Sequence, residues 1–188
     1  MLPGFSSPAA SFEQPFEMLA ACHDRVRRSL RRLQRLAGYL REHGSDEPAR
    51  QAATDVLRYF DIAAPHHHED EERHLFPVLL AHGSAPLRAA VQRLQHDHAE
   101  MSTAWAALRP ALQRIADGTA GGLAPDDEGR IGHFVSLYGD HLRIEDEEVY
   151  PAAKEHLDTP GLAQIGAEMA QRRGAAFPRP AGVSGARD

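Results

Sequence analysis

The sequence has a single cysteine, few aromatic residues and no long apolar run. Cys22 has no second cysteine to pair with, which excludes an internal disulfide and favours a reducing compartment. Aromatic residues make up only 6%, whereas Ala, Leu, Arg, Glu and Gln are abundant, and this balance favours helices over strands. No apolar stretch reaches the length of a membrane span, and residues 1–15 lack the basic start and apolar run of a signal peptide. We therefore expect a cytoplasmic protein with no membrane partner.

Charge gives no reason to expect nucleic acid as a partner, because the net charge is −6 with histidine neutral. The chain of 188 residues suits one domain with ends to spare, and 42% hydrophobic residues are enough for a sizeable core. Twelve histidines are the one strong departure from ordinary composition. They call for a chemical explanation.

Apolar residues recur at spacings of three and four in four long segments, near residues 15–43, 47–78, 86–115 and 126–149. Gly44, Gly83 and the glycine-rich stretch 118–125 separate them. The pattern predicts an all-α fold, an up-down-up-down four-helix bundle with a short C-terminal helix. The oligomeric state is not indicated.

The domain boundaries follow from composition. We expect a flexible N-terminus over residues 1–14, one domain over 15–157, a short helix over 158–173 and a disordered tail over 174–188. Pro65 should kink the second helix and Pro110 should bend the third.

A twelve-residue phrase occurs twice, once in the second helical segment and once in the fourth. The aligned pairs are His67 with His141, Glu71 with Glu145, Glu72 with Asp146, Leu75 with Val149, Phe76 with Tyr150 and Pro77 with Pro151. Each copy holds a His-x-x-x-Glu pair, and residues four apart lie on the same face of a helix. A single pair of this kind is more often a solvated helix face than a metal site.

Six polar residues fall on the apolar stripes that should face the bundle core: His23, His67, Glu71, His98, His141 and Glu145. Buried charges without partners are costly, and metal coordination is the usual way for a bundle to tolerate such a cluster. The order also repeats, since one half runs His, His, Glu and the other does the same. If each carboxylate bridges, each of two metals receives two nitrogens and two oxygens. This leaves positions for a bridging oxo or hydroxo group and a small ligand, which fits iron or manganese better than a closed structural zinc site.

The ordered set of motifs resembles the hemerythrin-like, or HHE cation-binding, domain family. The resemblance covers roughly residues 15–157 and is carried by His23-Asp24-Arg25, His67-His68 with Glu71-Glu72 and Leu75-Phe76-Pro77, Asp97-His98, and His141 with Glu145-Asp146 and Val149-Tyr150-Pro151. It implies a four-helix bundle that holds two non-haem iron ions. It also implies chemistry with dioxygen, nitric oxide or peroxide, or a role in iron and redox sensing. Zinc or manganese in place of iron stays open.

Some positions depart from related patterns. Oxygen-carrying hemerythrins have a second histidine four residues before the one at His98, but here that residue is Leu94, which places reversible oxygen carriage in doubt. Their carboxylate on the fourth helix would correspond to Asp146, whereas the HHE pattern uses Glu145. His74 is a further candidate ligand or a hydrogen-bonding neighbour of the site. No role is assigned to His66, His68, His43, His82, His133 or His156, some of which could bind metal loosely at the surface.

Ferritin-like di-iron proteins are the rival class, but they use two Glu-x-x-His motifs, and only Glu71 and His74 have that spacing here. The sequence therefore favours a metal-binding or sensing protein for oxygen, nitric oxide or peroxide. The alternatives are a di-iron enzyme that consumes peroxide or nitric oxide, and an iron-handling protein without catalysis.

Overall fold

The computed structural model describes residues 11–177, and all regular secondary structure in this range is helical. Most of the predicted flexible N-terminus and of the predicted C-terminal tail lies outside the described residues. No helix within residues 11–177 is both long enough and apolar enough to cross a lipid bilayer.

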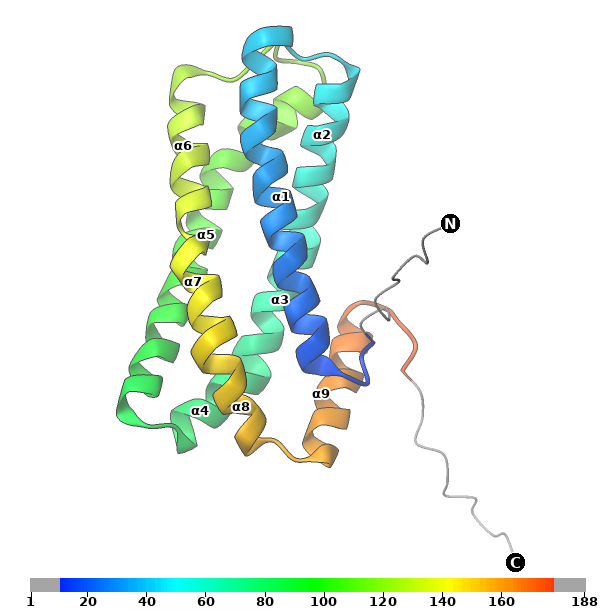
Figure 1. Ribbon diagram of the computed structural model, residues 1–188. Coiled ribbons are helices and arrows are strands. Elements are labelled where there is room, and N and C mark those ends of the chain that lie inside the picture. Colours follow the sequence, from blue (N-terminus) through cyan, green and yellow to red (C-terminus); the bar gives the residue numbers. More distant parts are fainter. Residues whose placement is uncertain (1–10, 178–188) are drawn as a thin grey trace, which may run out of the picture.

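Four long helical segments lie side by side (Figure 1). They are α1 (Pro15–His43); α2 (Glu47–Arg58), α3 (Ala64–Asp70) and α4 (Phe76–His82) in succession; α5 (Ala85–Ala116); and α6 (Pro125–Ser136), α7 (Tyr138–Ile144) and α8 (Tyr150–His156) in succession. Successive segments run in opposite directions, and α1 and α5 each pack against both α2 and α6. Side-chain caps start two of the segments, because Asp46 accepts a hydrogen bond from the Ala49 N–H and Ser84 accepts one from the Leu87 N–H.

Three π-helical turns interrupt the second and fourth segments: η1 (Tyr59–Ala63), η2 (Glu71–Leu75) and η3 (Glu145–Val149). Each turn lies directly before an X-Pro pair, with the prolines at 65, 77 and 151. A proline has no N–H to donate, and its ring clashes with the carbonyl four residues earlier, so the helix widens at this point. The residue before the proline donates instead to the carbonyl five residues back, as Phe76 does to Glu71 and Tyr150 to Glu145.

The two prolines singled out in the sequence behave differently. The irregularity predicted at Pro65 takes the form of the π turn η1, whereas α5 continues through Pro110 to Ala116.

The duplicated phrase encodes a duplicated backbone feature, the π turns η2 and η3, which the helical pattern alone does not reveal. In both copies the π turn begins at the buried glutamate.

A layer of buried polar side chains separates two apolar cores. One core extends toward the end of the bundle where α1 joins α2, and the other extends toward α4, α8 and the C-terminal helix. On α1, His23 lies between Leu19 of one core and Val26 of the other, and on α5, His98 lies between Leu94 and Met101 in the same way. The apolar cores therefore cover the polar layer on both sides.

The C-terminal helix α9 (Thr159–Arg172) packs against α1 and α3 (Figure 1). The fully buried Asp70 anchors it, since one carboxylate oxygen accepts hydrogen bonds from Arg172 and the other accepts one from Arg173, the shortest at 2.6 Å. Gly166 sits so close to the backbone of Phe12 that a Cβ there would lie 1.9 Å from the Phe12 carbonyl oxygen. Both ends of the described chain therefore meet beside α3.

We predict that Asp70→Asn lowers the free energy of unfolding of the metal-free protein by about 3 kcal/mol, because it leaves two largely buried arginines without a counter-charge. Asp55→Asn is the matched control, since it breaks an exposed ion pair with Arg32 that should contribute about 1 kcal/mol or less. Chemical denaturation measures both. Equal losses in the two variants would show that Asp70 does not anchor α9.

Candidate metal centre

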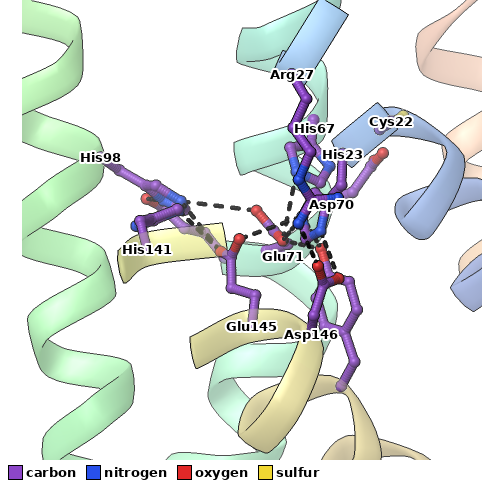
Figure 2. A network of polar contacts seen from close by, with 12 residues as sticks. Cys22, His23, Arg27, His67, Asp70, Glu71, His98, His141, Glu145 and Asp146 are labelled. Carbon is purple, nitrogen blue, oxygen red and sulfur yellow. Dashed lines mark hydrogen bonds and ion pairs between the residues drawn. The ribbon is translucent and has the colours of Figure 1, made fainter. Parts of the chain in front are cut away.

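All six residues predicted on the core-facing stripes meet in the buried polar layer (Figure 2). His98 and His141 lie together on one side, His23 and His67 lie on the other, and the carboxylates of the two glutamates lie between the pairs. Every one of the six is at most 4% exposed.

Each glutamate directs one oxygen toward each histidine pair. For Glu71, Oε1 lies 3.6 Å from Nε2 of His67 and Oε2 lies 3.6 Å from Nε2 of His98. For Glu145, Oε2 lies 3.2 Å from Nε2 of His23 and Oε1 lies 3.0 Å from Nε2 of His141. Both carboxylates therefore lie between two pairs of imidazole nitrogens, a placement from which they could bridge two cations.

Carboxylates behind the site fix the orientation of three of the imidazoles. Nδ1 of His23 bonds Asp146 at 2.7 Å, and Nδ1 of His98 bonds Glu72 at 2.8 Å. A carboxylate accepts from Nδ1–H, so Nε2 is directed at the centre and offers its lone pair there once the ring is neutral, as in metal-ligating histidines.

The third carboxylate of this kind is Asp97, which bonds Nδ1 of His141 at 3.3 Å. On the fourth segment, Glu145 faces the centre, whereas Asp146 lies behind His23 and also bonds Arg27 at 2.6 Å. The structure therefore places Asp146 as a neighbour of a ligand candidate rather than at the centre.

The centre contains buried polar atoms that lack hydrogen-bond partners within the described protein. They are both ring nitrogens of His67, Nε2 of His98, Nε2 of His141, Oε2 of Glu71 and both carboxylate oxygens of Glu145. Each such atom costs about 1–3 kcal/mol when left unsatisfied. Cations bound between nitrogen and oxygen donors would satisfy nearly all of them at once, so the residues present fit a metal pair.

The two glutamates have pKa values shifted in opposite directions. Burial raises the pKa of Glu71 well above its usual range, and the neighbouring Glu145 carboxylate adds to the rise. Burial also acts to raise the pKa of Glu145, but the imidazoles of His141, His23 and His98 outweigh it and hold that pKa well below its usual range. Without a cation the site therefore favours a single carboxylate charge.

The histidines divide in a similar way. Burial lowers the pKa of His67 and of His68 well below the usual range, so both rings are neutral. For His23 and His98 burial acts in the same direction, but hydrogen bonds that the rings donate to carboxylates outweigh it and raise the pKa above its usual range. These two rings therefore hold a proton more readily than His67 and His68 do.

Tyr150 is a member of the site that the helical pattern does not reveal. Its hydroxyl donates to Oε1 of Glu71 and lies 2.9 Å from Nε2 of His23. Burial raises the pKa of this phenol well above its usual range, so the hydroxyl keeps the proton it donates. The only signal in the sequence is the replacement of Phe76 by Tyr150 between the two copies of the phrase.

His68, to which the sequence assigns no role, also lies at the centre. His68, His98 and His141 each offer a nitrogen, and the three nitrogens lie within 4.8 Å of one another. The other group with this property is His23, His67, Glu71 and Glu145. His74, in contrast, points to α9, where its Nε2 lies 2.9 Å from Arg172 and 3.6 Å from Glu168.

We predict that Tyr150→Phe lowers the free energy of unfolding of the metal-free protein by about 1–3 kcal/mol, because Glu71 loses its hydrogen-bond donor in a buried site. The loss should shrink in the metal-loaded protein, where a cation satisfies the carboxylate. Tyr39→Phe is the control, since its hydroxyl bonds Asp46 near the surface and does not touch the centre. Denaturation of both forms measures the difference, and identical losses with and without metal would contradict the placement of Tyr150.

Metal affinity should rise with pH. The sign follows from the raised pKa of Glu71, His23 and His98, because a cation must displace the protons that these groups hold. Proton release on addition of ferrous iron under anaerobic conditions, followed with an indicator dye in weak buffer, measures the effect. Asp146→Asn should reduce the release by lowering the pKa of His23. Metal uptake without proton release between about pH 6 and 7.5 would refute this assignment.

Comparison with known proteins agrees with this geometry. A family model described as Hemerythrin HHE cation binding domain matches residues 14–153. A protein of Haemophilus influenzae (strain ATCC 51907 / DSM 11121 / KW20 / Rd), named only as an uncharacterized protein, is 32% identical over 165 residues, which cover 87% of this chain and 92% of the relative. The matched region contains α1 through η3 and all six core-facing residues. The chain belongs to the hemerythrin HHE cation-binding domain family.

Proposed function

We propose that this chain holds two iron ions and uses them to bind or sense a small oxidant or diatomic molecule such as dioxygen, nitric oxide or peroxide. The observation that carries the proposal is the bridging placement of Glu71 and Glu145, each of which offers one oxygen to either histidine pair. His23 and His67 would hold one ion, and His98 and His141 the other.

The donor set supports iron. Imidazole and carboxylate ligands with open positions suit redox-active iron or manganese, whereas structural zinc prefers a closed tetrahedral site. A bound iron pair would supply the redox chemistry, and the protein would supply four imidazoles, three of them oriented by carboxylates, and two carboxylates placed between the histidine pairs. We further propose that the four helical segments form the up-down-up-down bundle of this family and that the protein is cytoplasmic.

A cavity of about 780 Å³ gives small molecules a route to one side of the centre. It is lined by His68 and His98 at its inner end, by Glu72 and Arg73, and by the apolar side chains of Phe60, Met101 and Trp105 among others. Tyr150, in contrast, covers the site on the side of His23. An incoming ligand is therefore expected on the side of His98 and His141.

The first test is the metal content of protein purified under anaerobic conditions. The wild-type chain should contain about two irons, as in other bundles with paired carboxylates. His98→Ala should reduce the content to about one, whereas His133→Ala, an exposed histidine on α6, should leave it unchanged. Tightly bound zinc alone, or no metal, in the wild-type chain would refute the proposal.

The second test separates binding from catalysis. Oxygen, nitric oxide or peroxide is added to the reduced protein, and optical absorption is followed. A stable, reversible spectral change indicates binding or sensing, repeated consumption of the added molecule indicates an enzyme, and no response with iron retained indicates iron handling. His98→Ala serves as the control in each case.

A further inference from the structure

His68 is placed between the access cavity and the metal centre. It belongs to α3, one residue after His67, and its ring stacks on that of His98 with centroids 3.9 Å apart and planes 11° apart. It also lines the cavity of about 780 Å³. Its ring is therefore enclosed by the site on one side and faces the cavity on the other.

The two metal positions are unequal without His68. The position of His23 and His67 has Tyr150 beside it, whose hydroxyl lies 2.9 Å from Nε2 of His23. The position of His98 and His141 has the ring of Phe76 instead, stacked 5.6 Å from the ring of His98. A phenyl ring offers no ligand atom, so the second position is one polar group short on this side.

Helix α5 offers no second histidine to the position formed by His98 and His141. The residue one turn before His98 is Leu94, which is fully buried in an apolar core. His68 approaches the same position from α3, and its ring nitrogen falls within 4.8 Å of the ligand nitrogens of His98 and His141.

We propose that His68 is the third imidazole of the metal position formed by His98 and His141. This inference rests on the proposed metal pair and adds a ligand to one member of it. The nearly parallel rings of His68 and His98 cannot both contain one ion in their planes, so the His68 ring must turn about its Cβ–Cγ bond. This torsion is broad in histidine, and the cavity beside the ring gives it room.

The same arrangement makes His68 the side chain that an incoming molecule meets at the inner end of the cavity. The seventh ligand would therefore also be a side chain that lines the access route.

The decisive variant is His68→Phe, which keeps a ring stacked on His98 but removes both nitrogens. His66→Phe is the matched control, since His66 lies two residues earlier with its side chain 31% exposed and outside the cluster. Metal content at controlled free ferrous iron measures affinity, and X-ray absorption at the iron edge counts imidazole ligands. Thermal unfolding of the metal-free variants checks that each one folds.

We expect His68→Phe to weaken binding of one iron by at least about 10-fold, the lower end of what the loss of a supporting group costs a metal site. The imidazole count should fall by one per iron pair, with the other iron retained. His66→Phe should match the wild-type chain in both measurements. Equal affinity and equal imidazole count in His68→Phe would show that His68 only packs against His98.

The outcome also separates this inference from the proposed function. If the wild-type chain binds a single ion that is lost in His68→Phe and kept in His67→Phe, the metal pair is wrong but the ligand role of His68 stands. If that single ion is kept in His68→Phe, both are wrong.

Discussion

The enclosure of two carboxylates in one buried layer is the constraint on which the rest of this structure depends. Glu71 and Glu145 are fully buried and close to each other, an arrangement that costs several kcal/mol per charge in the absence of compensation. Four imidazoles and the Tyr150 hydroxyl surround them, and apolar cores pack on both sides of the layer. These groups offset part of the cost of burial, and their donor atoms are placed so that cations between the two histidine pairs would offset the rest.

Backbone geometry sets the position of each carboxylate. Glu71 and Glu145 each begin a π turn, and Pro77 and Pro151 cause these turns by removing a helical hydrogen bond. The extra residue in each turn rotates the glutamate relative to the core-facing side chains that follow it. The proline that ends each copy of the repeated phrase is therefore part of the construction of the site, although it lies a turn and a half from the ligand.

The sequence predicts the helical segments and the six core-facing residues because both follow from spacing along one helix. His98, for example, shares a stripe with Leu94 and Met101, which is visible without a structure. His68 escapes this reasoning because it is one residue from His67 and so points about 100° around the helix from it. Its proximity to His98 arises only from the packing of α3 beside α5. The hydrogen bond from the Tyr150 hydroxyl to Glu71 likewise cannot be read from one helix, because it joins two different segments and depends on the π turn before Tyr150.

The two halves of the bundle share a plan, including the carboxylates of Asp146 and Glu72 behind His23 and His98, but differ at other supporting positions. Asp97 orients His141, whereas the equivalent residue before His23 is Cys22, and Nδ1 of His67 has no partner among the described residues. The buried Asp70, which holds α9, has Ile144 as its counterpart, so an added helix covers only one half. One position is thus closed by α9 and a tyrosine, and the other borders a cavity with a histidine at its inner end. In the proposed metal pair, the repeated residues would build two similar positions, and the unrepeated neighbours would leave the position of His98 and His141 open to an outside molecule.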